Sequence, residues 1–396
     1  MKINLAVFFG CRSVEHEISI ISAVQAMNSM NNEKYNIIPV YVAKNGVMYT
    51  GDNMMTIDIF KNEKQLAEEC DVINIVRRED GVYVEYCKNG LFSKKKPIRL
   101  DICFPIVHGT NCEDGSIQGY FEMLGIPYVG CDVISSSIGM DKVLFKNILQ
   151  ARGIPVLPCI DFYSRDYAEN KEMILENILS KIGLPVIVKP ANLGSSVGIS
   201  KAETEDELTE AIDLACSFAS KVLVERAVCN LREINCSVLG NSDECRPSAL
   251  EEPIMHDKIL SYDDKYKQNA SKSGSKGMAS LSRKLPAELP EGKTEEIQNW
   301  AVETFKAIGA SGVVRIDFLM DVDDGNKVYV NEINTIPGSL SFYLWEATGL
   351  KYTDLLDEMI SLGFKRDRDR ENLMFTINTN ILSETSFGSK GSKVGK

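Results

Sequence analysis

The sequence predicts an α/β protein of mixed α and β elements, divided into two or three domains. Near the start, an apolar run is followed by a glycine turn and then by apolar residues at helical spacing. Further along, a Gly/Ser-rich loop lies between two short apolar runs, and near residue 320 two more apolar runs flank a polar turn. A chain of 396 residues is long enough for more than one sizeable core.

Residues 1–130 are expected to form a Rossmann-like domain built on a parallel sheet. Ile3–Phe9 reads as a buried strand closed by Gly10, and Ile18–Met27 has the spacing of a helix. A polar, glycine-bearing loop at 108–115 directly follows a buried strand, which is where α/β folds place ligand-binding groups. Further strands are expected at Tyr35–Val42, Gly81–Tyr86, Pro97–Val107 and Ile126–Val129.

The next segment, residues 131–225, is predicted to carry an anion-binding loop. Helices are expected at Ser135–Arg152 and Asp166–Ile182, before a strand that contains Lys189. The Gly/Ser loop at 191–201 offers backbone N–H groups between Lys189 and Lys201, which suits a triphosphate. The alternative is a plain hairpin loop with solvated lysines, and no P-loop pattern is present because Gly-Lys-Ser/Thr is absent.

Residues 313–338 predict a β-hairpin with one polar face. Strand residues alternate faces, so Arg315 and Asp317 point the same way, and so do Glu332 and Asn334. Carboxylate and amide oxygens on one face suit Mg²⁺, which is usually held by one or two carboxylates and substrate phosphates. The alternative is an ion-paired strand face that is merely solvated.

Composition excludes several classes of protein. The net charge of −12 argues against nucleic acid or an anionic membrane as the main partner. Eleven cysteines without a C-x-x-C pair indicate reduced thiols in a cytoplasmic protein, not disulfides or a zinc site. The short apolar start favours a buried strand over a signal peptide, and no apolar run approaches membrane-spanning length.

The rest of the chain, residues 226–396, combines the hairpin with a polar loop and a polar end. The segment 265–290 has five serines and five lysines, and long polar loops inside domains are usually functional lids. Residues 365–396 alternate Arg and Asp and then become rich in Ser, Gly and Lys, which predicts a poorly ordered tail.

Eight short motifs follow one another along the chain. They are 9–19 (FGCRSVEHEIS), 108–122 (HG…EDGSIQGYFE), 125–130 (GIPYVG), 140–142 (MDK), 188–198 (VKPANLGSSVG), 264–266 (DKY), 315–317 (RID) and 331–338 (NEINTIPG). Together they resemble the D-alanine–D-alanine ligase family, a branch of the ATP-grasp fold, and they occur in that family's order. The resemblance spans residues 3 to about 363.

The resemblance implies three domains: an N-terminal domain at 1–130, a central ATP-grasp subdomain at 131–225 and a C-terminal one at 226–364. ATP is expected between the last two, under a lid at about 262–290. The residues implied to bind ATP are Lys142, Lys189, Gly194, Ser195, Ser196, Glu225, Glu233 and Lys265, with the two glutamates on the adenosine part. Two Mg²⁺ ions, or Mn²⁺, are implied at Asp317, Glu332 and Asn334, with Glu332 bridging.

The resemblance also assigns the reacting centre. Glu15, supported by His108, is implied to take the ammonium of the first amino acid, and Ser195 and Tyr266 to link to Glu15 and hold the lid shut. Arg315 and the N–H of Gly338 are implied to stabilise an oxyanion, and Ser339 or Ser341 to hold the second substrate's carboxylate. Plainer alternatives are a helix-capping role for Glu15, a structural histidine at 108 and an ordinary loop aromatic at 266.

Three features depart from the family pattern. Cys11 occupies a position where the family usually has glycine, and the lid is longer and richer in serine and lysine. The segment after Gly338 is shorter by about four residues, a change in loop length that a fold can tolerate.

The implied function is ATP-dependent ligation of two D-alanines through an acyl phosphate, for peptidoglycan precursor synthesis in the cytoplasm, by a homodimer. One alternative is a ligase that joins D-alanine to D-serine, D-lactate or another acceptor. Another is an ATP-binding regulator without catalysis, which retention of a full set of charged ligands argues against.

Overall fold

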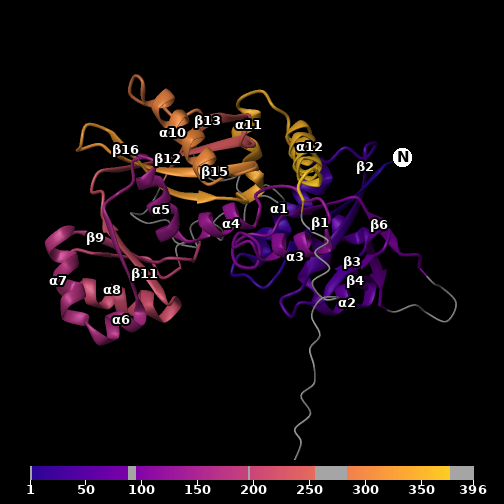
Figure 1. The fold of residues 1–396 in the computed structure, drawn as a ribbon, viewed down its shortest axis with the longest axis horizontal. Helices are drawn as coiled ribbons and strands as arrows, with labels where there is room; N and C mark the ends of the chain where they lie inside the picture. The colour runs from indigo at the N-terminus through magenta and orange to yellow at the C-terminus, as the bar shows by residue number, and fades with distance from the viewer. Residues whose placement is uncertain (1, 88–94, 195–196, 255–282, 375–396) are drawn as a thin grey trace, which may run out of the picture.

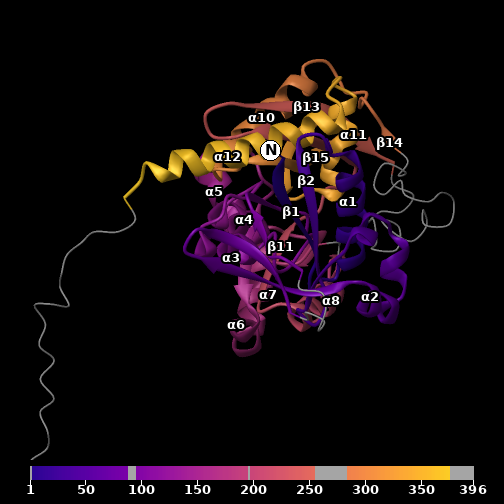
Figure 2. The same cartoon turned by 90° about the vertical axis from the view of Figure 1, so that its right-hand side faces the viewer.

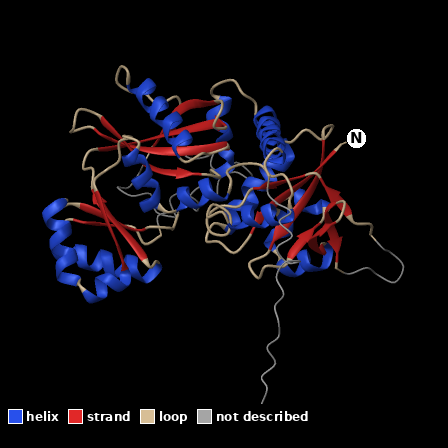
Figure 3. Cartoon of the chain, in the orientation of Figure 1, coloured by secondary structure: helices blue, strands red, loops and turns tan. Residues whose placement is uncertain are grey.

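The computed structural model describes residues 2–87, 95–194, 197–254 and 283–374. Their strands form three sheets, and helices pack against these sheets (Figures 1 and 3). The predicted site residues Ser195, Ser196, Lys265 and Tyr266 lie outside the described residues, as does most of the predicted lid. Among the described helices, none is both long and apolar enough to cross a membrane.

The first sheet has the strand order β6-β5-β4-β3-β2-β1-β7. Only one end of it is parallel, where β1 (Ile3–Gly10) lies between β2 (Tyr35–Val42) and the edge strand β7 (Ile102–Pro105), and Leu5 to Phe9 are fully buried. The antiparallel strands are β3 (Met48–Thr50), β4 (Asp71–Arg78), β5 (Gly81–Tyr86) and β6 (Ile98–Leu100), and the helices of this part are α1 (His16–Ser29), α2 (Glu63–Glu69) and α3 (Ser116–Leu124).

The expected strand at 126–129 was wrong. Its backbone makes a single bridge, between Tyr128 and Cys103, because the chain turns away directly into α4 (Val133–Met140). The expectation of a parallel sheet holds for β2, β1 and β7. The loops that follow β1 and β7 leave the sheet at this parallel part.

The second sheet is antiparallel, in the order β10-β9-β11-β8. The predicted helix at 166–182 is two helices, because the backbone of Asn170 leaves the helical conformation between them. The elements are β8 (Cys159–Tyr163), α6 (Ser164–Glu169), α7 (Lys171–Lys181), β9 (Val186–Pro190), β10 (Ser200–Ala202), α8 (Glu205–Phe218) and β11 (Lys221–Arg226).

The predicted helix at 135–152 is also two helices, α4 (Val133–Met140) and α5 (Lys142–Ala151). Asp141 divides them: its backbone is extended, and its side chain accepts hydrogen bonds from the N–H groups of Val143 and Leu144. Aspartate is a favoured N-cap because it satisfies N–H groups that the first helical turn leaves unpaired. The break makes Lys142 the first residue of α5.

The third sheet has the order β14-β13-β12-β15-β16 and contains the predicted hairpin. Helix α10 (Lys293–Ala307) packs against this sheet, and its buried Phe305 shares a core with Ile234 and Phe318. The strands are β12 (Leu231–Gly240), β13 (Cys245–Pro253), β14 (Arg283–Lys284), β15 (Gly312–Asp321) and β16 (Lys327–Asn334), followed by the short helix α11 (Phe342–Glu346).

The final helix, α12 (Tyr352–Glu371), contradicts the prediction of a tail from residue 365. It lies between the first and third sheets (Figure 2). Arg366 explains the extension, because its guanidinium donates to the carbonyl oxygens of Gly130 and Tyr128, each at 2.5 Å. The rest of the predicted tail, from residue 375, lies outside the described residues, and the predicted domain boundaries stay predictions.

Candidate active site

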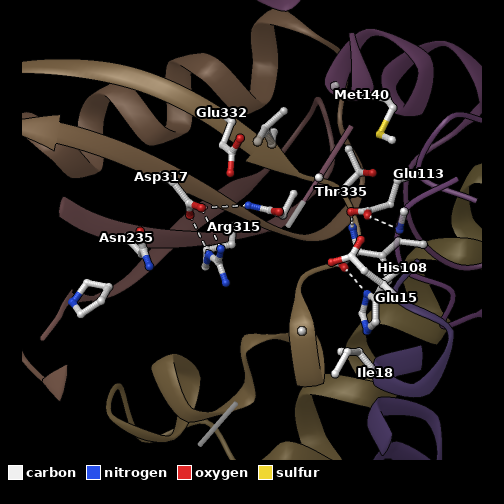
Figure 4. A pocket seen from close by; sticks show the side chains of 18 of the residues that line it. Glu15, Ile18, His108, Glu113, Met140, Asn235, Arg315, Asp317, Glu332 and Thr335 are labelled. Atoms are coloured by element: carbon white, nitrogen blue, oxygen red, sulfur yellow. Dashed lines mark hydrogen bonds and ion pairs between the residues drawn. The ribbon is translucent and has the colours of Figure 1, made fainter. Parts of the chain in front are cut away.

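A pocket lies where loops from the three sheets meet (Figure 4). Its lining comes from the loops after β1 and β7, the start of α5, the loop after β9, and strands β12 to β16. Ten predicted site residues line it: Glu15, His108, Lys142, Gly194, Glu233, Arg315, Asp317, Glu332, Asn334 and Gly338.

The polar face of the hairpin forms one wall. In the register of β15 and β16, Asp317 pairs with Glu332 and Arg315 with Asn334. The Arg315 guanidinium donates two hydrogen bonds, of 2.6 and 2.7 Å, to the Asp317 carboxylate, and the Asn334 amide donates to the same carboxylate at 3.0 Å. The opposite face of β15 is core, as predicted from alternation: Val314, Ile316, Phe318 and Met320 are fully buried.

The charge and the orientation of Arg315 in this wall are set by its pairing with Asp317. Burial alone would lower the pKa of Arg315, but the adjacent Asp317 raises it, so the guanidinium is permanently charged. A bidentate arginine–carboxylate pair also holds both groups in one plane.

Two buried lysines lie beside the hairpin. Lys142 donates to the carbonyl oxygen of Leu193 at 2.7 Å, and its Nζ is 3.6 Å from the carboxylate of Glu332. Burial lowers the pKa of Lys142, although Glu332 opposes the shift. Lys189 donates to the Asn331 side chain at 3.2 Å. Both cations therefore lie close to the strand that carries Glu332.

Glu225 lies at the end of β11 between two lysines. It is 2% exposed and forms ion pairs with Lys189 and with Lys146, whose Nζ is 2.8 Å away. Burial would raise the pKa of Glu225, but the two lysines lower it to about 2. Sequence reasoning missed Lys146, although it follows Lys142 by one helical turn on α5 and so lies on the same face.

The opposite wall carries Glu15 and His108, both buried. Glu15 occupies the N-cap position of α1, but its side chain makes no capping hydrogen bond, so the helix-capping alternative loses support. His108 contacts the carbonyl oxygen of Ile336 through Nδ1 and the hydroxyl of Ser22 through Nε2, both at 2.8 Å. Burial lowers the pKa of His108, which favours the neutral imidazole.

The loop after β9 reaches this wall. A Cβ on Gly194 would lie 3.4 Å from a carboxylate oxygen of Glu15, so the two approach closely. The loop after β9 and the loop after β1 therefore meet at the carboxylate that is predicted to bind the first substrate.

Glu113 lines the pocket and belongs to the motif at 108–122, but the family resemblance assigns it no role. Its carboxylate accepts hydrogen bonds from the backbone N–H groups of Gly109 at 2.6 Å and Ile336 at 3.2 Å. Burial, together with the nearby Glu15, raises its pKa to about 8. Through these two hydrogen bonds, Glu113 connects the loop after β7 to the segment that follows β16. The sequence signal for a role of Glu113 was its position in the polar loop at 108–115, directly after a buried strand.

The shortened segment after Gly338 turns its serines away from the pocket. Ser339, Leu340 and Ser341 all have positive φ, near 50°, and all are buried. The N–H of Ser339 donates to Ser22 at 3.0 Å, and neither Ser339 nor Ser341 lines the pocket. The structure thus gives no support to the assignment of either hydroxyl to the second substrate.

The backbone conformation of Cys11 accounts for the glycine that the family usually has at this position. Its φ is 65°, a left-handed conformation that favours glycine. Its N–H donates to the carbonyl oxygen of Val42 at 2.7 Å, and burial followed by the charge of Asp114 raises the pKa of the thiol to about 12. Cys11 does not line the pocket.

Comparison with known proteins agrees with this geometry. Family models described as D-ala D-ala ligase N-terminus and D-ala D-ala ligase C-terminus match residues 4–131 and 148–361. The chain belongs to the D-alanine–D-alanine ligase family. Within this family, D-alanine–D-alanine ligases of Thermosipho melanesiensis and Caldicellulosiruptor bescii are each 40% identical over 381 residues. These alignments cover 96% and 95% of this chain and 98% and 99% of the relatives.

Solved structures of the family show the same fold. The D-alanine–D-alanine ligase of Coxiella burnetii matches with a TM-score of 0.78 at 31% identity, covering 97% of this chain and 99% of that one. The VanG D-Ala:D-Ser ligase of Enterococcus faecalis matches with a TM-score of 0.75 at 30% identity, covering 92% and 100%. The predicted ATP-grasp fold is thereby confirmed.

Proposed function

We propose that this chain joins two molecules of D-alanine at the expense of ATP. The observation that carries the proposal is the pocket itself, in which the Arg315–Asp317 pair and Glu332 face Glu15 and His108 across a single space (Figure 4). Family membership supports the same reaction.

The first D-alanine is proposed to bind at the wall formed by Glu15. A buried carboxylate attracts an ammonium group strongly, because little water competes with it. His108, neutral and fixed at both ring nitrogens, supports the loop that carries this site.

ATP is proposed to lie along the lysines. Lys142 and Lys189 would hold phosphate oxygens under the loop of Gly194, Ser195 and Ser196, with Lys265 added from the lid. Glu225 and Glu233 would bind the adenosine part. Lys146 makes this arrangement feasible, because it still balances the charge of Glu225 when Lys189 turns towards a phosphate.

Asp317, Glu332 and Asn334 fit a site for Mg²⁺ or Mn²⁺, since they supply two carboxylates and an amide oxygen on adjacent strands. Two ions are proposed, with Glu332 between them. When bound, such ions neutralise phosphate oxygens and so favour phosphoryl transfer.

The reaction requires two steps at one carboxyl group. The carboxylate of the first D-alanine attacks the γ-phosphorus of ATP, and the P–O bond to ADP breaks, giving an acyl phosphate. The amine of the second D-alanine then attacks the acyl carbon, loses a proton and expels phosphate. Arg315 and the N–H of Gly338 stabilise the oxyanion that forms between these events. Ser195 and Tyr266 are proposed to hold the lid closed against water, because an acyl phosphate hydrolyses.

A second candidate is ligation of D-alanine to D-serine, D-lactate or another acceptor. The buried loop serines favour keeping it, because they leave the acceptor side unlike the family pattern. Incubation of the protein with ATP, Mg²⁺, D-alanine and equal amounts of the competing acceptors, followed by mass analysis, separates the candidates. Absence of D-alanyl-D-alanine at saturating D-alanine would reject the leading form, and ATP binding without phosphate release would indicate a regulator.

The proposed setting is peptidoglycan precursor synthesis in the cytoplasm, with the chain acting as a homodimer. Sedimentation equilibrium tests the dimer directly, since monomer and dimer differ twofold in mass.

A further inference from the structure

We infer that Arg283 binds the carboxylate of the acceptor amino acid. The inference rests on the proposed function and names the recognition group that the buried serines at 339 and 341 do not provide. It applies to any acceptor with a free carboxylate, whether the attacking group is an amine or a hydroxyl.

Contacts with Glu251 and Tyr343 help to hold Arg283 in the pocket wall. It begins β14, where it pairs with Pro253 of β13, and it lines the pocket. Its Nη1 donates to Glu251 at 2.6 Å, and its guanidinium carbon lies 3.9 Å from the ring centroid of Tyr343. A guanidinium stacked on a ring is positioned before a ligand arrives, so less freedom is lost on binding.

Glu251 serves as the anchor for this arginine. Its carboxylate, 3% exposed, also accepts hydrogen bonds from Asn235 at 3.0 Å and from the Tyr343 hydroxyl at 2.9 Å. With Arg283 from β14, these donors come from three elements, β12, β14 and α11, which together fix one buried carboxylate. An arginine has five N–H donors in a planar fork and can bind a second carboxylate alongside the first.

The position within the pocket selects the acceptor rather than the first substrate. Asn235 lies on the side of Arg315 and Asp317, across the pocket from Glu15 and His108 (Figure 4). Arg283 contacts the carboxylate that Asn235 also contacts, so it belongs to that far side. The proposed oxyanion donors, Arg315 and Gly338, belong to the same pocket and are the groups that the acceptor's amine must approach.

The test compares acceptors with and without a carboxylate. D-alanine serves as the first substrate, and D-alanine or D-alaninamide as acceptor; the dipeptide and its amide differ in mass. Arg283→Met is expected to raise the KM for the D-alanine acceptor about 10- to 100-fold, the usual effect of losing a charge-assisted hydrogen bond. The KM values for ATP and for the first D-alanine should change less than about twofold, because neither contacts this residue under the proposal.

The discrimination between acceptors is the more specific readout. Wild-type protein should prefer D-alanine over D-alaninamide, and Arg283→Met should lose most of that preference. Arg283→Lys keeps the charge but not the fork, so an intermediate preference is expected.

Arg246→Met is the matched control. Arg246 also pairs with a glutamate, Glu358 at 2.6 Å, and lies over an aromatic ring, that of Trp345, but it does not line the pocket. Its acceptor KM should equal that of wild type. An unchanged acceptor preference in Arg283→Met, or equal losses for both D-alanine sites, would overturn the inference while leaving the proposed function intact. Failure of the wild-type protein to make any dipeptide would overturn both.

Discussion

Asp317 is the residue on which the hairpin wall depends most. Its carboxylate accepts from Arg315 and Asn334, and it belongs to the proposed metal ligands. Its replacement therefore changes a ligand, a bidentate partner and the local charge together.

Asp317→Asn is expected to lower kcat by about 100-fold or more, because an aligned charged group at a reacting centre contributes on that order. Asp323→Asn is the control, since Asp323 is exposed in the hairpin turn and accepts only from Asn230 among the contacts described. Phosphate release during dipeptide synthesis measures both variants. Near wild-type turnover in Asp317→Asn would remove the metal and oxyanion assignments of this wall.

Glu113 is expected to make stability depend on pH. Its folded pKa, about 8, lies above the ordinary carboxyl value, so the folded state holds a proton that the unfolded chain has already released. The stability from this group is complete below the ordinary pKa and is lost as pH rises to about 8. Within that window the slope is about 1.4 kcal/mol of unfolding free energy for each pH unit.

Glu113→Gln should remove this slope, since an amide does not titrate, even if the variant is less stable at every pH. Urea unfolding at several pH values between about 5 and 8 measures it, the window set by the raised folded pKa. Parallel pH profiles for wild type and variant would show that Glu113 is ionised in the folded protein.

At the scale of elements, helix α12 packs against both the first and the third sheet. Arg366 in its last turns donates to two carbonyl oxygens at 128–130, where the predicted strand is absent. Those carbonyls have little sheet pairing of their own, so the arginine satisfies them.

Arg366→Ala is expected to lower the unfolding free energy by about 1–3 kcal/mol, the cost of leaving partly buried acceptors unpaired. Arg368→Ala, at an exposed position two residues along, should change it by less than about 0.5 kcal/mol. Thermal unfolding followed by circular dichroism compares them. Equal stabilities of the two variants would mean that water replaces Arg366 without cost.

How far the sequence predicts this protein also depends on scale. The hairpin was predictable because alternation of period two assigns Val314 and Ile316 to the core and Arg315 and Asp317 to the other face. The single helix over 135–152 was wrong because an aspartate within an apolar pattern acted as a cap.

Other site residues depend on tertiary contacts that no local pattern reports. Arg283 looks like an ordinary surface cation in sequence, and only packing brings it to Glu251. The direction of the serines after Gly338 depends on three consecutive positive φ angles, which the residue types Ser-Leu-Ser do not favour.

At the scale of the whole molecule, different parts of the chain carry the proposed site for the first D-alanine and the proposed site for the nucleotide. Glu15 and His108 come from loops of the first sheet, whereas Lys142 and Glu332 come from α5 and the third sheet. Binding energy from each ligand should therefore be removable separately.

ADP with Mg²⁺ and D-alanine should each raise the melting temperature, since a ligand at 100 times its Kd stabilises the folded state by about 2.7 kcal/mol. Glu15→Gln should lose the part of the D-alanine increment that comes from the first-substrate site and keep the ADP increment, whereas Lys142→Met should lose the ADP increment and keep the D-alanine increment. Differential scanning fluorimetry with each ligand alone measures four increments, two for each variant, and a run with both ligands follows. If either variant lost both increments equally, the two proposed sites would not be separate but one cooperative unit, because each ligand would then need the whole pocket formed before it could bind.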